Sequence, residues 1–219
     1  MPSRVVAIHT AMTAIRIVGD AFREILPEVD LVNILDDSIT PDAVKAGRID
    51  QNIARRMLDH FCAAQTSGAA VILLCCSTVG ETADIARALI TTPIVRIDEA
   101  MAERAVAVGT RVGILATAES TLGPTSRLVQ RKATEAGRQV ELRTKLVGGA
   151  WEMVEKGDVQ RHDQLVLEAI VQLAKEVDVV VLAQATIARI LPQVGDVGVP
   201  VLSSPRLGVE RVRQALRGK

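Results

Sequence analysis

The fold is decided by the stretch Val71-Ile72-Leu73-Leu74-Cys75-Cys76-Ser77-Thr78-Val79-Gly80. Its first part is a short apolar run, as a strand buried on both faces requires, and small polar residues follow before a helical pattern from Val79 to Leu89. In an open α/β sheet, the carboxyl ends of strands and the amino ends of helices meet at one edge, where unpaired N–H groups face a ligand crevice. The sequence therefore predicts that the Cys76 thiol lies at the ligand-binding edge of a parallel sheet.

Strand and helix patterns alternate through the first half of the chain. Pro27 ends one helical pattern, and Thr40 with Pro41 is typical of the start of another helix. The expected strands are Arg4–Ile8, Asp30–Leu35, Val71–Leu74 and Pro93–Ile97, and the expected helices include Thr13–Leu26, Asp50–Thr66 and Val79–Leu89. This order predicts a parallel sheet with helices on both of its faces.

The second half of the chain repeats this plan. Arg111–Ala118 can be laid on Arg4–Ala11 at an offset of 107 residues, and Val179–Leu182 on Val71–Leu74 at an offset of 108. Any two strand–helix units share some pattern, but a nearly constant offset over both matches favours a duplicated α/β plan.

Two pseudo-symmetric halves follow from this repeat. The expected fold class is α/β, with two doubly wound parallel-sheet (Rossmann-like) halves and the active site between them. The first half is expected to contain residues 1–97 plus 205–219 and to carry Cys76. The second is expected to contain residues 98–204 and to carry Ala185 and Thr186.

The composition favours a small-molecule partner. The chain has 26 basic and 26 acidic side chains, so no net field attracts nucleic acid or an anionic membrane. Aromatic residues make up 1% of the chain, which leaves almost no platform for stacking on bases. Without a signal-peptide pattern or an apolar window near the ~20 residues of a membrane span, we expect a cytoplasmic protein. The 3 cysteines lack disulfide or zinc spacing and are expected to be reduced thiols.

Cys76 is the strongest candidate for chemistry. A thiol at the start of a helix is close to N–H groups that favour the thiolate, and a cation or a histidine adds to this effect. Such a thiolate acts as a base or a nucleophile, whereas the ordinary alternative is a buried structural cysteine. Cys75 points to the opposite side of the strand and Cys62 lies inside a long helix, so both are expected in the core.

His9 ends the first strand, which a doubly wound order places beside the strand of Cys76. We interpret the two as a possible Cys/His pair in which the imidazole orients or protonates the thiol. A histidine satisfied only by backbone groups is the equally weighted alternative. The two other histidines, His60 and His162, are expected to face solvent.

Hydroxyl groups gather where helices of the second half begin. Thr117, Ser120 and Thr121 precede or open one helix, and Thr186 opens another. Hydroxyls and free N–H groups at helix starts bind carboxylates, although simple helix capping suits Ser120 and Thr121 best. The cluster Asp36-Asp37-Ser38 is better explained by turn chemistry than by substrate contact. No nucleotide or metal motif occurs, so we expect no cofactor and no metal.

Three motifs together resemble the aspartate/glutamate racemase superfamily, which includes hydantoin racemases, maleate cis–trans isomerases and arylmalonate decarboxylases. The resemblance covers nearly the whole chain. Cys76-Ser77-Thr78 stands where the family has Cys-Asn-Thr, and Gly113-Ile114-Leu115-Ala116-Thr117 is similar to its Gly-x-x-Ala-Thr. Leu182-Ala183-Gln184-Ala185-Thr186 resembles its Leu-x-Gly-Cys-Thr.

The resemblance implies a cofactor-free site in which two cysteines, one from each half, face opposite sides of a carbon next to a carboxylate. Cys76 is the first of these, but the second position carries Ala185. His9 falls where glutamate racemases have an acidic residue that assists the first cysteine. Since alanine can neither donate nor accept a proton, symmetric two-thiol racemisation should fail, while one-sided protonation stays open. The family's arylmalonate decarboxylases also keep a single cysteine, the other one.

The expected function is that of a cofactor-independent racemase-superfamily isomerase acting on a small acid through Cys76. Decarboxylation of a substituted malonate-type acid and non-catalytic binding of a small carboxylate are the alternatives. We expect a homodimer or larger homo-oligomer. Catalysis is assigned to Cys76 and His9, and substrate binding to Thr10, Ser77, Thr78, Thr117, Gln184 and Thr186.

Overall fold

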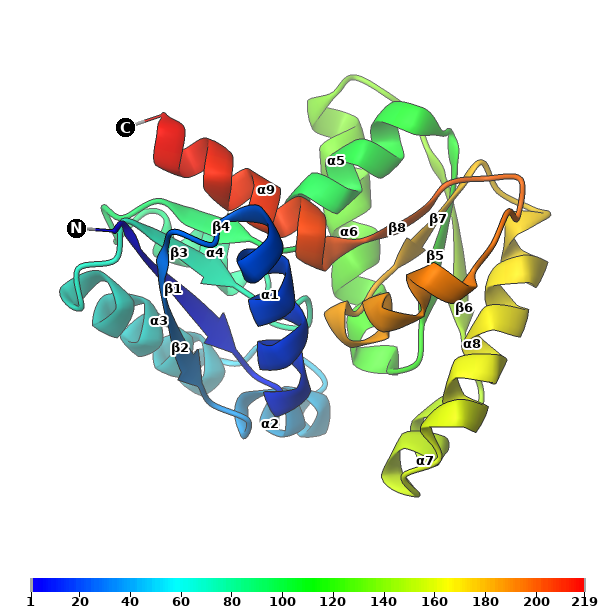
Figure 1. Cartoon of the computed structure of the whole chain (residues 1–219), viewed down its shortest axis with the longest axis horizontal. Helices are drawn as coiled ribbons and strands as arrows, with labels where there is room; N and C mark the ends of the chain where they lie inside the picture. The colour runs from blue at the N-terminus through cyan, green and yellow to red at the C-terminus, as the bar shows by residue number, and fades with distance from the viewer. Residues whose placement is uncertain (1, 219) are drawn as a thin grey trace. The chain divides into compact units, whose positions relative to one another are not determined.

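The structure is a computed structural model that describes residues 2–218, and Figure 1 shows its two parallel sheets with their helices. The chain divides into two compact units, Met1–Ala100 with Pro205–Lys219 and Met101–Ser204. Each unit contains one sheet of four parallel strands. The predicted fold class, two doubly wound α/β halves, is therefore confirmed.

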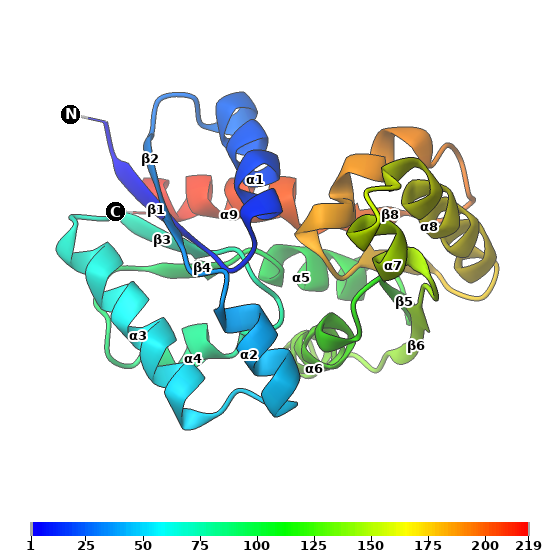
Figure 2. The same ribbon diagram turned by 90° about the horizontal axis from the view of Figure 1, so that it is seen from below.

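In the first unit the strands are ordered β2-β1-β3-β4. They are β1 (Arg4–His9), β2 (Asp30–Leu35), β3 (Val71–Leu74) and β4 (Ile94–Arg96), and the helices are α1 (Met12–Ile25), α2 (Ile39–Ala46), α3 (Gln51–Thr66), α4 (Thr82–Ala86) and α9 (Ser204–Arg217). Figure 2 shows α1 and α9 on one face of the sheet and α3 with α4 on the other. The apolar side chains of β3 are fully buried because helices cover both faces.

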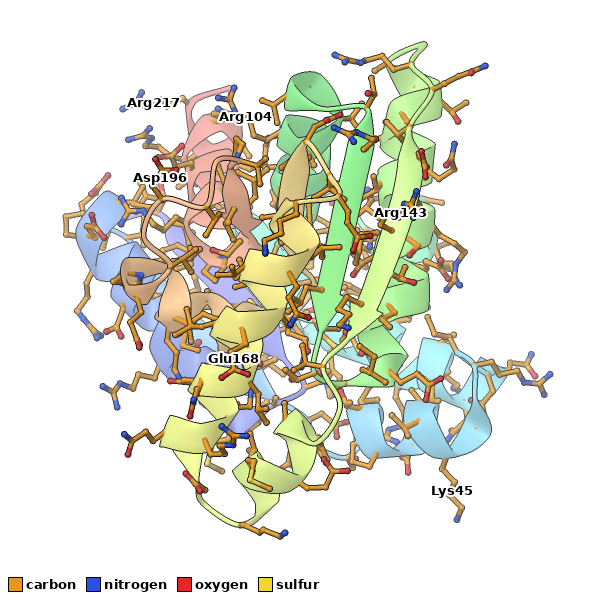
Figure 3. All side chains as sticks on the ribbon, turned by 90° about the vertical axis from the view of Figure 1, so that its right-hand side faces the viewer. Lys45, Arg104, Arg143, Glu168, Asp196 and Arg217 are labelled. Carbon is orange, nitrogen blue, oxygen red and sulfur yellow. The ribbon has the colours of Figure 1, made fainter. Side chains whose placement is uncertain are left out.

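The second unit has the equivalent order β6-β5-β7-β8. Its strands are β5 (Arg111–Ala116), β6 (Glu141–Leu146), β7 (Val179–Leu182) and β8 (Val201–Ser203), with helices α5 (Glu99–Val108), α6 (Glu119–Glu135), α7 (Ala150–Glu155), α8 (Val159–Ala174) and the 3-10 helix η1 (Ala185–Gln193). Helices α8 and η1 pack on one face around Leu115, Val180 and Leu182. The outer strand β6 is mostly exposed and carries charged residues such as Arg143, and Glu168 is exposed on α8 (Figure 3). Charges on an edge strand discourage pairing with another chain.

The two units share the register of their central strands. Ile8 pairs with Leu74, and the N–H of Cys75 donates to the Ile8 carbonyl at 2.9 Å. Leu115 pairs with Leu182 in the same way, and the N–H of Ala183 donates to the Leu115 carbonyl at 2.9 Å. Cys75 is therefore equivalent to Ala183, and the following residue, Cys76, is equivalent to Gln184.

The helix expected from Val79 to Leu89 is shorter than predicted. Only Thr82–Ala86 is α-helical, and it is preceded by hydrogen bonds of the tighter type, from Gly80 N to Ser77 O and from Thr82 N to Val79 O. In the second unit the equivalent segment is the 3-10 helix η1. The expected helix Val79–Leu89 was thus wrong in its length. Within residues 2–218, no helix has the length and apolar content needed to cross a bilayer.

Candidate active site

The Cys76 side chain lies just beyond the carboxyl end of β3. It is partly exposed and packs beside the core residues of the α3 face, which include Ile8 and Leu74. Its Sγ is 3.8 Å from Oγ1 of Thr40, at the start of α2, and the Thr40 hydroxyl donates to Oγ1 of Thr10 at 2.8 Å. The segments that follow β1 and β3, together with the start of α2, thus bring two hydroxyls and one thiol together.

Ser77 and Thr78 follow Cys76 in the turn and are buried, with 7% and 8% of their surfaces exposed. The turn leads into α4, which has only five residues. A helix that short has a small dipole, because the dipole sums over aligned peptide units. The structure therefore gives less support than the sequence did to activation of the thiol by a helix amino terminus.

A buried ion pair lies beneath this turn. Arg96, at the end of β4, and Asp98 are each 1% exposed and join through two contacts, Nε–Oδ1 at 3.2 Å and Nη2–Oδ2 at 3.3 Å. A Cβ atom on Gly80 would lie 2.7 Å from the Arg96 Cζ, so a larger residue would force the turn or the guanidinium to move. The ion pair and Gly80 together fix the backbone that follows Cys76.

His9 does not contact Cys76. Its Nε2 lies 2.9 Å from Asn33 Oδ1, its Nδ1 is buried with no hydrogen-bond partner among the described residues, and the whole residue is 0% exposed. By the strand register, His9 is level with Cys75 and Thr10 is level with Cys76, so the side chains of His9 and Cys76 point to opposite faces. Burial lowers the pKa of His9, and the hydrogen bond with Asn33 opposes this only in part. The expected Cys/His contact is therefore not formed, and a catalytic part for His9 stays a prediction.

The remaining cysteines divide between core and surface. Cys75 is buried as expected, and burial, with the neighbouring Cys76, raises the pKa of its thiol well above the usual range. Cys62 is exposed, so its predicted place in the core was wrong. The core stripe of α3 runs through Ile53, Met57, Phe61 and Ala64, and Cys62 lies off that stripe.

The two other histidines also differ from expectation. His60 is half-buried, and its Nε2 is 2.9 Å from Asp36 Oδ2. His162 is 1% exposed at the start of α8, where Nδ1 lies 2.8 Å from Asp163 Oδ1 and Arg189 binds the same carboxylate. Both were expected to face solvent. Each histidine instead contacts a carboxylate whose bonds connect two neighbouring segments.

Asp36 serves the structure of the first unit. Its carboxylate accepts hydrogen bonds from the Ser38 hydroxyl at 2.6 Å and from Arg56 Nη2 at 2.9 Å, besides the contact with His60. Burial alone would raise the pKa of Asp36, but the bonds from Ser38, His60 and Arg56 outweigh burial and hold the pKa well below its usual range. These bonds link the end of β2 to α3, in agreement with turn chemistry.

In the second unit, the Gln184 side chain links the ends of the two equivalent strands, β5 and β7, by hydrogen bonds. Its Oε1 accepts from the Thr117 N–H at 2.7 Å, the Thr117 hydroxyl at 3.1 Å and the Ala118 N–H at 3.1 Å. Thr121 donates to the Ala118 carbonyl at 2.8 Å, as a residue in a first helical turn can. Thr186 is half-buried, and its carbonyl accepts from Arg189 at 2.9 Å.

The second unit has no thiol at the position equivalent to Cys76. The register gives Gln184 as that position, one residue before the Ala185 expected from the motif. Ala185 itself is buried, with 8% of its surface exposed. With either alignment, the side chain at this strand end cannot exchange a proton as a cysteine does.

Nothing in the sequence indicated that Thr40 and Arg96 belong to this region. Thr40 was interpreted only as a helix cap, and its place beside Cys76 depends on how α2 packs. Arg96 occurs in a short apolar strand with no indication that Asp98 folds back on it.

Within residues 2–218, no cluster of three or more His, Cys, Asp or Glu residues is arranged to hold a metal ion.

Solved structures of racemases share this fold. Allantoin racemase from Klebsiella pneumoniae is 20% identical, with a TM-score of 0.72 over 98% of this chain and 88% of that chain. Aspartate racemase from Picrophilus torridus is 17% identical, with a TM-score of 0.70 over 97% and 94%. Glutamate racemase from Bacillus anthracis is 15% identical, with a TM-score of 0.70 over 99% and 82%. At these identities the likeness shows the fold alone.

Sequence comparison supplies the family. None of the curated proteins matches the chain significantly. The family model described as Asp/Glu/Hydantoin racemase matches residues 5–212, nearly the whole length. The match includes Cys76, both central strands and Gln184. The chain belongs to the Asp/Glu/hydantoin racemase family.

Proposed function

We propose that the chain is a cofactor-independent isomerase that acts at the carbon next to the carboxylate of a small acid, with Cys76 as its proton-transferring group. The observation that carries the proposal is the position of Cys76 in a member of this family. The thiol is partly exposed at the end of a central strand and lies 3.8 Å from a hydroxyl that is itself hydrogen-bonded to Thr10. Strand ends of this kind are where open α/β sheets bind ligands.

The proposed chemistry is a proton transfer. The Cys76 thiolate takes the proton from the carbon next to the carboxylate, and the C–H electron pair is delocalised into that carboxylate as an enolate. A proton then returns to that carbon. Return from the Cys76 thiol regenerates the starting enantiomer with its hydrogen exchanged. Inversion instead takes a proton from water on the opposite face, and the hydroxide that is left takes the proton from the Cys76 thiol. An ordinary thiol is only a few per cent thiolate at neutral pH, so the polar neighbours of Cys76 matter for the rate.

Substrate binding is proposed for Thr10, Ser77 and Thr78 in the first unit and for Thr186 in the second. Hydroxyl and N–H donors stabilise the negative charge that grows on the carboxylate oxygens when the proton leaves. Thr117 and Gln184 are hydrogen-bonded to each other, so neither offers all its donors and acceptors to a ligand. His9 is kept in the proposal only as a buried residue of β1. Its predicted part in catalysis must be tested by substitution.

Proton transfer is proposed to be one-sided. A racemase with two thiols removes the proton from either enantiomer, one thiol for each face. In this chain neither Gln184 nor Ala185 has a group that titrates near neutral pH. We therefore expect Cys76 to act on one enantiomer of a chiral acid much faster than on the other.

Deuterium exchange tests the proposal. A panel of small amino, hydroxy and substituted dicarboxylic acids is incubated with the protein in D₂O, and deuterium at the carbon next to the carboxylate is followed by proton NMR for each enantiomer. Exchange is expected for one enantiomer and should fall by at least about 100-fold in Cys76→Ala, the usual contribution of a general acid or base. The matched control is Cys62→Ala, an exposed cysteine on α3. Similar exchange rates for both enantiomers would contradict the one-sided account.

A decarboxylase is the second candidate, favoured by the absence of a thiol from Gln184 and Ala185. In that reaction a C–C bond of a malonate-type acid breaks, CO₂ leaves, and Cys76 protonates one face of the carbanion. Release of CO₂ with a single product enantiomer would identify it. A protein that binds an acid equally well with and without the Cys76 thiol, and turns over no member of the panel, would instead be a carboxylate-binding protein.

We propose action without a cofactor, no nucleic-acid or membrane partner, a cytoplasmic location and a homo-oligomeric state.

A further inference from the structure

Gln184 occupies the joint between β5 and α6. One oxygen, Oε1, accepts three hydrogen bonds, from the Thr117 N–H, the Thr117 hydroxyl and the Ala118 N–H, at 2.7, 3.1 and 3.1 Å. The acceptor is 66 and 67 residues away in sequence from these donors, so the contact is tertiary. A side-chain carbonyl oxygen with three converging donors has the surroundings that a carboxylate oxygen would need.

The joint requires an acceptor because the chain provides none locally. The residue at the start of α6 is Ala118, in extended conformation with φ −118° and ψ 124°, and no side chain of its own caps the helix. Gln184 accepts from the N–H groups of Thr117 and Ala118, which precede the first residue of the helix, and backbone donors of this kind need a partner when they are removed from water. A capping side chain at Ala118 would instead accept from an N–H two or three residues further on. Gln184 therefore supplies an acceptor to the two N–H groups at the end of β5.

The first unit has a different residue at the corresponding position. There the equivalent helix α1 begins after Ala11, which is also extended, with φ −149° and ψ 128°, and makes no side-chain cap. The position equivalent to Gln184 is Cys76, whose shorter side chain contacts Thr40 instead. Both helices begin after an extended alanine, and the joints differ in the residue that the neighbouring central strand presents, a carboxamide bonded to the joint in the second unit and a thiol beside Thr40 in the first.

We propose that Gln184 is a specificity-determining residue that keeps the Thr117–Ala118 joint closed to carboxylates. The carboxamide oxygen and a carboxylate oxygen compete for the same three donors. A free anion forms stronger, charge-assisted hydrogen bonds, but the tethered carboxamide is present at a high effective concentration. Acids that need this joint for a carboxylate are therefore excluded, and Thr117 does not act as the carboxylate ligand expected from the sequence.

Amide NMR titration tests the closure directly. The whole ¹⁵N-labelled protein is titrated with sodium acetate against sodium chloride at equal ionic strength, and the Thr117 and Ala118 amide resonances are followed. The wild-type protein is expected to show no saturable shift at these two amides. Gln184→Ala is expected to show saturable shifts at both, with a dissociation constant at least tenfold below any limit set for the wild type.

Two further variants separate closure from a structural effect. Gln184→Glu keeps an oxygen in the joint and should stay closed, while Gln184→Asn, shorter by one methylene, should open. Gln172→Ala, an exposed glutamine of α8, should behave as the wild type. If Gln184→Ala misfolds, Gln184→Asn carries the test.

The proposal is overturned if wild-type protein binds acetate at these amides as tightly as the opened variants. It is also overturned if a folded Gln184→Ala or Gln184→Asn protein binds none. Because the readout is binding at two backbone amides, it does not depend on any turnover, and it succeeds or fails separately from the proton transfer proposed for Cys76.

Discussion

The two units have the same strand order and the same register of central strands, yet they end those strands differently. In the first unit the second residue after β3 is a partly exposed thiol, Cys76, and the turn that follows lies on a buried Arg96–Asp98 pair. In the second unit the equivalent residue is Gln184, which closes its own helix joint. The two units thus share a framework and differ in the residue at the end of the central strand, which is a thiol in the first unit and a hydrogen-bonded carboxamide in the second.

The largest difference between the units is expected at their ion pairs. Arg96→Met removes one partner of a pair that is 1% exposed on both sides and leaves Asp98 buried without its counter-ion. We expect a loss of about 3–5 kcal/mol in the free energy of unfolding, measured by urea denaturation.

The matched change in the second unit is Arg111→Met. Arg111 pairs with Asp178, but the two side chains are 51% and 28% exposed, and Asp178 keeps its bonds to the N–H groups of Thr110 and Arg111. Water screens such a pair, so we expect a far smaller change. Equal losses from the two substitutions would show that the buried pair does not support the Cys76 turn.

Gly80→Ala should have the next largest effect. The new Cβ would lie 2.7 Å from the Arg96 Cζ, so either the turn or the guanidinium must move, and overpacking of this kind costs about 1–3 kcal/mol. The control is Gly19→Ala inside α1, where the nearest atom to the new Cβ is 3.7 Å away and alanine is the better helix former. We expect thermal unfolding to shift down for Gly80→Ala and slightly up for Gly19→Ala. A neutral Gly80→Ala would contradict the packing described here.

A smaller effect concerns pH and His9. Its folded-state pKa lies below the ordinary value of 6.5 because burial disfavours the imidazolium ion. As pH falls below 6.5, the unfolded chain takes up the proton first, so stability falls until the folded-state pKa is reached, by up to about 1.4 kcal/mol per pH unit. Above that range His9 contributes no pH dependence.

The comparison variant is His9→Gln, which removes the titrating group and keeps an amide donor for Asn33. Urea denaturation is measured at pH 7.5, 6.5 and 5.5. Between pH 6.5 and 5.5 the free energy of unfolding should fall less for the variant than for the wild type. Parallel losses would mean that His9 is protonated in the folded protein as readily as in the unfolded chain.

The framework could be predicted from the sequence because it depends on local patterns. The buried run Val71–Leu74 and the repeat at offsets of 107 and 108 were sufficient for two parallel sheets. The contact considered between His9 and Cys76 does not form, since adjacency of strands does not say which faces the side chains share. Register decides that, and register is set by packing across the whole sheet.

The surroundings of Cys76 depended on tertiary contacts that no spacing reveals. Thr40 reaches the thiol from α2, and Gly80 crosses the Arg96 guanidinium in the turn before α4. Gln184 was recognised as flanking a missing thiol, but its three bonds to the α6 joint join residues far apart in the chain. His162 shows the same limit, because a histidine near a helix start gives no sign that it will be buried.

The most direct test of the central claim is the alkylation rate of Cys76 relative to Cys62. Cys62 is the more exposed thiol, so accessibility alone predicts that it reacts faster with iodoacetamide, as mass spectrometry of the digested protein would show. An activated Cys76 should react faster at about pH 6.5, and a bound acid from the exchange panel should protect it while leaving Cys62 unchanged. Faster reaction of Cys62, with no protection of Cys76 by any acid, would contradict the account.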